Sequence, residues 1–201
     1  LWLTALVALI MALFAGREIL SRQERRLKGW WGYGIGSATM LLAGMVVTVL
    51  ALNGPLRPEP WYDPRYAIPL FGMILGNAMT GISLGLDGLT SLVGRERAAI
   101  EAQLTLGAPR WRALRPIAQR ALRTGFTPML NSMAAAGVVF LPGMMTGQIL
   151  SGVAPEQAVK YQILVLFLIA GASGLGVLTA VLASIWRLTD DRHRLRLDRL
   201  A

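Results

Sequence analysis

The sequence predicts an all-α fold, a bundle of helices that crosses a membrane several times. Hydrophobic residues make up 54% of the 201 residues and charged residues only 15%. Most of the charge lies in three clusters, so that long uncharged stretches remain between them. A helix needs about 20 predominantly apolar residues to cross a bilayer. We therefore expect one polytopic transmembrane domain over residues 1–201, with about five spans at residues 1–16, 30–52, 66–93, 125–150 and 159–186.

The first two predicted spans differ in how they are bounded. Residues 1–16 begin at Leu1 inside an apolar run, without an initiator methionine or the charged start and cleavage site of a signal peptide. We therefore expect further residues of the protein to precede Leu1. Residues 30–52 start with two tryptophans, which are typical anchors at a membrane interface. The connection over residues 53–64 contains four prolines, which predict an irregular, outward-facing loop.

The third predicted span, residues 66–93, is rich in small residues. Gly72 and Gly76 have GxxxG spacing, and so do Gly81 and Gly85. Small residues let helix backbones approach closely in lipid, where van der Waals packing drives helix association. We therefore expect this span to be an inner helix of the bundle.

A basic insert, residues 94–124, separates the third span from the fourth. Arg95 to Leu106 contains good helix formers. Gly107 suits the left-handed conformation that ends a helix, and Pro109 suits the first turn of the next one. The prediction is a helix, a sharp corner and a second helix. Two roles fit this pattern: a docking surface for a partner protein, and an amphipathic helix that rests on anionic lipid headgroups.

The fourth predicted span, residues 125–150, is interrupted by Pro142 and Gly143. Proline removes a backbone hydrogen bond and glycine tolerates unusual dihedral angles, so we expect the helix to kink or break there. The alternative is a loop that starts at Pro142, just outside the lipid. The fifth span, residues 159–186, leads into an arginine-rich tail.

The basic residues predict the orientation of the chain. Of the 20 lysines and arginines, 17 lie in the first connection, the insert or the tail, and only Arg57, Arg65 and Lys160 lie elsewhere. The positive-inside bias then places the basic loops and the C-terminus in the cytoplasm. The net charge of +9 does not predict a nucleic-acid partner, because the tryptophans lie at span ends and are not interleaved with the arginines as stacking platforms. Membrane lipid is the expected surrounding.

The sequence contains no pattern typical of an enzyme. It has no cysteine, a single histidine, His193, and no Gly-Lys pair, which a Walker A phosphate loop requires. We therefore expect no catalytic residue and no cofactor in this chain. Methionine sulfur is a soft metal ligand, but methionine more often fills gaps between helices. Any metal ligand stays unidentified at this stage.

A few polar or soft side chains within the spans are candidates for lining a substrate path. Intramembrane polar residues are costly and usually face the interior of a bundle. The alternative is hydrogen bonding between helices, or, for Asp87, pairing with arginines at the cytoplasmic face. The candidates are Asn77, Asp87, Asn131, Met144, Met145 and Gln148.

Several motifs resemble the permeases of ABC transporters. Glu101, Ala102, Gly107 and Ile117 stand at the spacing of the EAA loop of such permeases, although Gln103 replaces its second alanine. Further segments are similar to the FetB family of permeases: residues 72–79, Ser132 with the Ala-Gly stretch after it, and residues 141–147 and 159–163.

The resemblance implies a multi-pass permease of the inner (plasma) membrane that is associated with iron export, with plant relatives linked to aluminium tolerance. It further implies a homodimer with a second permease copy and a FetA-like ATPase partner, which would bind ATP and magnesium. The substrate and the direction of transport do not follow from the residues themselves. The implied ATPase-docking residues are Glu101, Ala102, Gly107, Ala108, Pro109, Arg110 and Trp111.

Two other function classes remain open. One is an ATP-independent secondary transporter or channel, which would show a repeated hydropathy pattern. The other is a membrane scaffold that transports nothing and whose basic insert binds lipid headgroups.

Overall fold

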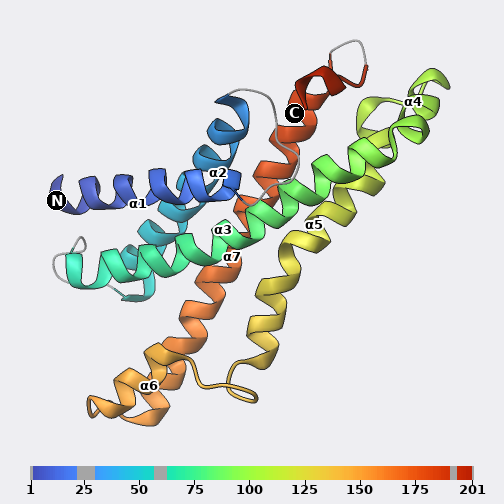
Figure 1. The fold of residues 1–201 in the computed structure, drawn as a ribbon. Coiled ribbons are helices and arrows are strands. Elements are labelled where there is room, and N and C mark those ends of the chain that lie inside the picture. The colour runs from blue at the N-terminus through green and yellow to red at the C-terminus, as the bar shows by residue number, and fades with distance from the viewer. Residues whose placement is uncertain (1, 22–29, 57–62, 191–193, 201) are drawn as a thin grey trace.

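The computed structural model describes residues 2–21, 30–56, 63–190 and 194–200, and this part of the chain is helical and contains no β-strand (Figure 1). The predicted all-α class is therefore confirmed. The elements, in chain order, are α1 (Trp2–Ser21), α2 (Trp30–Ala51), the π-helical turn η1 (Leu52–Leu56), α3 (Pro64–Arg95), α4 (Arg97–Thr105), α5 (Arg110–Ala135), α6 (Gly143–Leu150), α7 (Pro155–Leu188) and the 3-10 turn η2 (Leu197–Arg199).

Three helices in the described part are long and apolar enough to cross a membrane. They cover Trp31–Gly54, Ala67–Arg95 and Pro155–Leu188. These segments correspond to the second, third and fifth predicted spans. The first predicted span lies in α1, a 20-residue helix that carries Arg17 and Glu18 near its end and is not among the three.

The predicted boundaries of the fourth span are wrong. Helix α5 begins at Arg110, inside the predicted insert, and continues through Pro116 and Pro128 to Ala135. Its first half is basic, so only its last 12 residues are free of charge, and these span about 18 Å at 1.5 Å per residue. That is roughly 60% of the ~30 Å hydrocarbon core, so this segment of α5 is too short to cross a bilayer.

The predicted helix break is present but begins earlier than expected. The helical path ends after Ala135, and residues 136–142 form a non-helical segment in which Gly137 has a φ of +82°. Pro142 is the residue that caps the start of α6. Its ring fixes φ and suits a helix start, which explains why the break lies before this proline.

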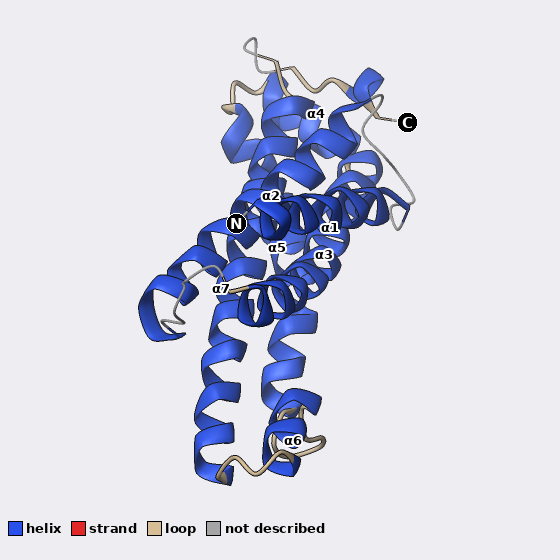
Figure 2. Cartoon of the chain, turned by 90° about the vertical axis from the view of Figure 1, so that its left-hand side faces the viewer, coloured by secondary structure: helices blue, strands red, loops and turns tan. Residues whose placement is uncertain are grey.

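Helix α3 is the centre of the bundle and contacts α1, α2, α5 and α7 (Figure 1). One hydrophobic cluster joins α3 to the α4 end of the molecule and includes Ile100, Leu114 and Leu188. A second cluster lies nearer α6 and includes Leu70 and Val165. Figure 2 shows α4 and α6 at opposite ends of the molecule.

Close packing at glycines confirms the predicted inner position of the third span. A Cβ at Gly81 would lie 2.9 Å from the backbone oxygen of Gly125, and a Cβ at Gly85 would lie 3.1 Å from Val177. The backbones of α3 and α5 therefore meet at glycine, with α7 behind them. Gly76 takes no part in this close packing, because a Cβ there would meet no atom within 4 Å.

Candidate functional site

The insert folds as a helix, a corner and a second helix, as its sequence predicts. Helix α4 ends at Thr105, and Gly107 adopts a φ of +86°, the left-handed region that favours glycine. The amides of Gly107 and Ala108 donate to the carbonyls of Leu104 and Gln103, at 3.1 and 3.0 Å, which closes the end of the helix.

Pro109 precedes α5 rather than starting its first turn. Its backbone is extended, with φ −67° and ψ 149°, and its carbonyl accepts from the amides of Arg112 and Ala113 at 2.9 and 3.2 Å. It therefore acts as the N-cap of α5, and the missing amide of proline costs no helical hydrogen bond at this position.

The residues predicted to dock an ATPase gather at this corner but differ in exposure. Ala102, Gly107, Pro109 and Trp111 are exposed, whereas Ala108 and Arg110 are partly buried. Glu101 is also partly buried, and its carboxylate accepts a hydrogen bond from Arg97 Nε on the same helix at 2.8 Å. The corner is therefore a small surface on which apolar and charged groups alternate.

Leu106 is an exposed apolar residue of the corner. Its side chain is 87% exposed, whereas Ile100, one and a half turns earlier, is 2% exposed. Ile117 is likewise buried, at 2%. The insert therefore attaches to the bundle through Ile100 and Ile117 and presents Leu106 outward. Its position directly before the left-handed Gly107 is the sequence signal for this, because a residue there lies beyond the last helical turn.

A bidentate ion pair holds the corner against the second helix. Arg120 donates from Nη1 and Nη2 to the two carboxylate oxygens of Glu96, at 2.6 and 2.7 Å. Glu96 is the single residue between α3 and α4. The hydrogen bond from Arg120 lowers the pKa of Glu96 below its ordinary value. The two residues are 24 positions apart, and no periodicity in the sequence predicts their pairing.

The six residues predicted to line a substrate path do not form one site. Asn77 lies on an open part of α3, and its side-chain amide donates to the carbonyl of Met73 at 2.8 Å. Asp87 is partly buried further along α3, and Asn131 is exposed on α5. The other three lie on α6, where Met145 is buried and Met144 and Gln148 are partly buried.

A cavity of about 140 Å³ with both polar and apolar walls lies where α3, α5 and α7 meet, and Asn77 is the one predicted path residue that lines it. Ser173 contributes a side chain that is only 1% exposed. Ser173 is not among the residues predicted from the sequence, because its neighbours on α7 are apolar and small. The walls are Asn77, Thr80, Gly81, Gly125, Pro128, Met129, Ser132 and Ser173.

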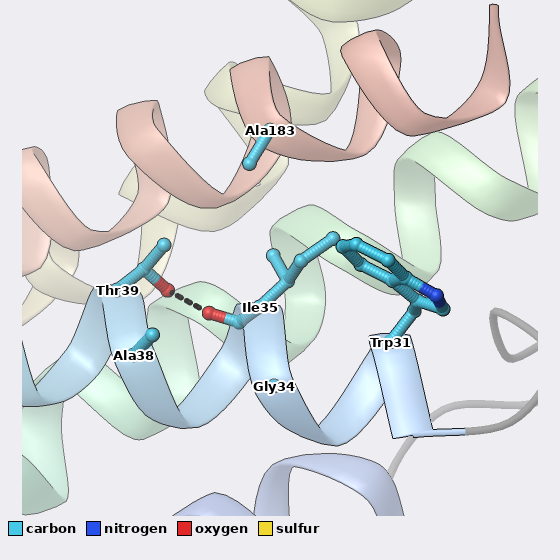
Figure 3. Close-up of a pocket in the computed structure, with 6 residues that line it drawn as sticks. All are labelled: Trp31, Gly34, Ile35, Ala38, Thr39 and Ala183. Carbon is cyan, nitrogen blue, oxygen red and sulfur yellow. Dashed lines mark hydrogen bonds between the residues drawn. The ribbon is translucent and has the colours of Figure 1, made fainter.

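A larger groove between α2 and α7 is apolar. Figure 3 shows Trp31, Gly34, Ile35, Ala38 and Thr39 on α2, with Ala183 facing them from α7. The Thr39 hydroxyl donates to the carbonyl of Ile35 at 2.7 Å, which occupies its hydrogen. Arg187 on α7 stacks over the Trp31 ring at 4.3 Å. This groove suits an aliphatic surface rather than a polar solute.

No group of three or more His, Cys, Asp or Glu side chains among the described residues could hold a metal ion. Carboxylate, imidazole and thiolate groups are the usual protein ligands of iron and zinc.

Comparison with known proteins finds relatives over almost the whole chain. Residues 1–188 match the family described as "Uncharacterised protein family (UPF0014)". The chain is 36% identical over 196 residues to UPF0014 membrane protein slr1647 of Synechocystis, which covers 96% of this chain and 73% of that protein.

Two further relatives carry more specific names. The chain is 34% identical over 153 residues to the probable iron export permease protein FetB of Escherichia coli, which covers 76% of this chain and 58% of that protein. It is 34% identical over 176 residues to the protein ALUMINUM SENSITIVE 3 of Arabidopsis thaliana, which covers 87% and 62%. The chain thus spans less than two thirds of these two relatives. No solved structure matches the chain.

Proposed function

This chain belongs to the UPF0014 family of membrane proteins, and we propose that it is the permease subunit of an ABC transporter that exports iron or another metal species. A separate ATPase subunit would dock on the insert at residues 94–124 and supply the energy. The name of the Escherichia coli relative, a probable iron export permease, supports the cargo class and the direction. The spacing of Glu101, Ala102, Gly107 and Ile117 supports the ATPase partner.

The observation that carries the proposal is the shape of the α4–α5 corner. A leucine that is 87% exposed stands beside a glycine with a φ of +86°, and Trp111 is 44% exposed on the other side of the turn. Exposed leucine and tryptophan beside arginines would suit a groove in a partner with apolar walls and an acidic rim. The Glu96–Arg120 ion pair and buried Ile100 hold this corner to the bundle. A displacement of the corner by the ATPase would therefore be transmitted to α3 and α5.

The proposal assigns the other roles as the family resemblance implies. ATP and magnesium would bind to the ATPase, and two permease copies would assemble with two ATPases. The insert and the C-terminal end of α7 lie at the same end of the molecule (Figure 1), where Leu188 and Ile100 belong to one hydrophobic cluster. In the inner membrane this end would face the cytoplasm, where the ATPase is.

A matched pair of leucine substitutions tests the docking surface. Leu106 and Leu150 both lie at the C-terminal end of a short helix, and they are 87% and 83% exposed at opposite ends of the molecule. We expect Leu106→Ser to abolish co-purification of a co-expressed FetA-like ATPase, because it removes the apolar tip of the corner. Leu150→Ser serves as the control and should retain the ATPase.

Gly107→Val tests the same surface through its backbone. A β-branched residue is strained at the φ of +86°, so the corner should change shape and the ATPase should be lost. If both Leu106→Ser and Gly107→Val retain the ATPase at the wild-type yield, the docking assignment is wrong. Metal transport by the purified chain in proteoliposomes without an ATPase would instead favour a secondary transporter or channel.

A further inference from the structure

Ser173 carries a buried hydroxyl for which the described residues provide no hydrogen-bond partner. Its side chain is 1% exposed and lines the cavity between α3, α5 and α7. Buried polar groups are nearly always hydrogen-bonded, to protein or to an ordered guest such as water. Among the buried unpartnered hydroxyls, that of Ser173 lines the cavity, so a guest in the cavity would be within its reach.

The other polar walls of the cavity are also uncharged oxygen donors. The side-chain amide nitrogen of Asn77 donates a hydrogen bond to the carbonyl of Met73, so the side-chain oxygen is the group that can bind a guest. Thr80 donates its hydrogen to the carbonyl of Gly76 at 3.3 Å and keeps lone pairs on its oxygen. Ser132 on α5 adds a third hydroxyl. Together with Ser173, four neutral oxygen groups from three helices surround one space.

The cavity lies near the middle of the long helices. Ser173 is about 27 Å along the helix axis from the start of α7 and about 22 Å from its end, at 1.5 Å per residue. On α3, Asn77 also lies in the middle third of the helix. If α3 and α7 span the membrane, Asn77 and Ser173 lie far from both aqueous phases, where lipid cannot satisfy them. Ser132, by contrast, lies three residues before the end of α5.

We propose that this cavity is a resting site for a small cation that retains part of its hydration shell. The inference rests on the proposed function, which supplies a cation as cargo. Hydroxyl and amide oxygens are ligands for hard cations. The volume of about 140 Å³ has room for an ion with several waters, since a water in the liquid occupies about 30 Å³.

Because the cavity walls carry no charged group, an ion in the cavity would keep part of its hydration shell. Removing all water from a multivalent ion is very costly unless charged ligands replace it. No carboxylate or imidazole lines this cavity. The ion would therefore keep much of its water and exchange only part of it for serine, threonine and asparagine oxygens. Binding would be weak, which suits a cargo that must leave again.

Cysteine substitution tests the site directly, because the natural chain contains no cysteine. Ser173→Cys replaces the hydroxyl by a thiol of similar size, which reacts with Ag⁺, a small hydrated cation. The matched control is Ser184→Cys. Ser184 lies on the same helix, is 0% exposed and likewise has no hydrogen-bond partner for its hydroxyl, but it does not line the cavity.

The assay treats membrane vesicles with silver nitrate and then measures the thiols left for maleimide after denaturation. We expect near-complete loss of maleimide labelling at Ser173→Cys, little loss at Ser184→Cys, and slower loss at Ser173→Cys when excess Mn²⁺ is present. Ser132→Cys, from the α5 wall, should behave like Ser173→Cys and replaces it if that variant does not reach the membrane.

Two results would overturn the resting site. Equal protection of cysteines at 173 and 184 from Ag⁺ would mean that the cavity is sealed, and reaction that Mn²⁺ does not slow would mean that it admits cations without binding them. The assay uses neither an ATPase nor net transport. Retention of the ATPase by Leu106→Ser and Gly107→Val would therefore contradict the proposed docking and leave the Ag⁺ result standing. Failure of the Ag⁺ assay would in turn leave the docking result standing.

Discussion

At the scale of single residues, Gly125 is a position where a side chain would meet the backbone of another helix. A Cβ there would lie 2.6 Å from Val177 Cγ1 and 2.8 Å from the backbone oxygen of Gly81. The valine can adjust its rotamer, but the oxygen belongs to the backbone of α3. We expect Gly125→Ala to force α3 and α5 apart and to destabilise the fold by about 1–3 kcal/mol, as overpacking does.

The melting temperature of the detergent-purified protein measures this effect. Gly76→Ala is the control, because Gly76 lies inside α3 and a Cβ there meets nothing within 4 Å. That change should be neutral or stabilising by up to ~1 kcal/mol, the difference in helix propensity between alanine and glycine. Equal melting temperatures for the two variants would contradict the close approach of α3 and α5.

Sequence spacing placed residues on a helical face but could not show what covers that face. The steps of three and four residues from Asn77 through Thr80 and Leu84 to Asp87 predict that Asn77 and Asp87 share one face of a helix. Asn77 does line the cavity. Ser173 was missed because one serine among small apolar residues is a weak signal until two other helices enclose it. The positive φ of Gly107 was predictable, since the end of a helix favours glycine for a local reason.

At the scale of elements, the Glu96–Arg120 ion pair fixes α4 relative to α5, and its contribution to stability should depend on pH. The folded pKa of Glu96 is lowered from its ordinary value of 4.5 by the hydrogen bond from Arg120. The ion pair therefore stabilises the fold fully above pH 4.5, and this stabilisation is lost as the pH falls through the lowered folded pKa.

The substitution Glu96→Gln measures this contribution. We expect the variant to melt below the wild type at pH 7, and the difference to disappear in acid as the wild-type carboxylate becomes protonated. Glu101→Gln is the control, because the Arg97–Glu101 pair joins two exposed residues of one helix and connects no elements. A constant difference between wild type and Glu96→Gln across the whole pH range would show that this carboxylate is not the group responsible.

The beginnings and ends of the helices were the features least predictable from the sequence. Pro116 and Pro128 lie inside α5 although proline disfavours a helix interior. The helix tolerates them because buried Leu114, Ile117 and Met129 anchor it to the bundle on both sides of these positions. Such anchoring depends on contacts with α3 and α7, which are distant in sequence. The three long apolar helices were predictable because length and composition alone identify them.

At the scale of the whole molecule, charge and shape point to the same polarity. The insert, with seven arginines among residues 95–123, lies at the same end of the molecule as the C-terminal end of α7, and α6 lies at the other end (Figure 1). No lysine or arginine occurs in residues 124–159, which include α6 and the segments around it. The positive-inside bias assigns the basic end to the cytoplasm, so α6 is expected on the outer side.

Single cysteines at the two exposed leucines test this orientation in a chain that otherwise has none. In intact cells, a membrane-impermeant maleimide should label Leu150→Cys, because this end would face outward. Leu106→Cys should be labelled only after the cells are permeabilised. Both positions are more than 80% exposed, so poor accessibility within the chain cannot explain a difference. Labelling of Leu106→Cys in intact cells would invert the topology and place the corner beyond the reach of any cytoplasmic ATPase, which would contradict the proposed energy source as well.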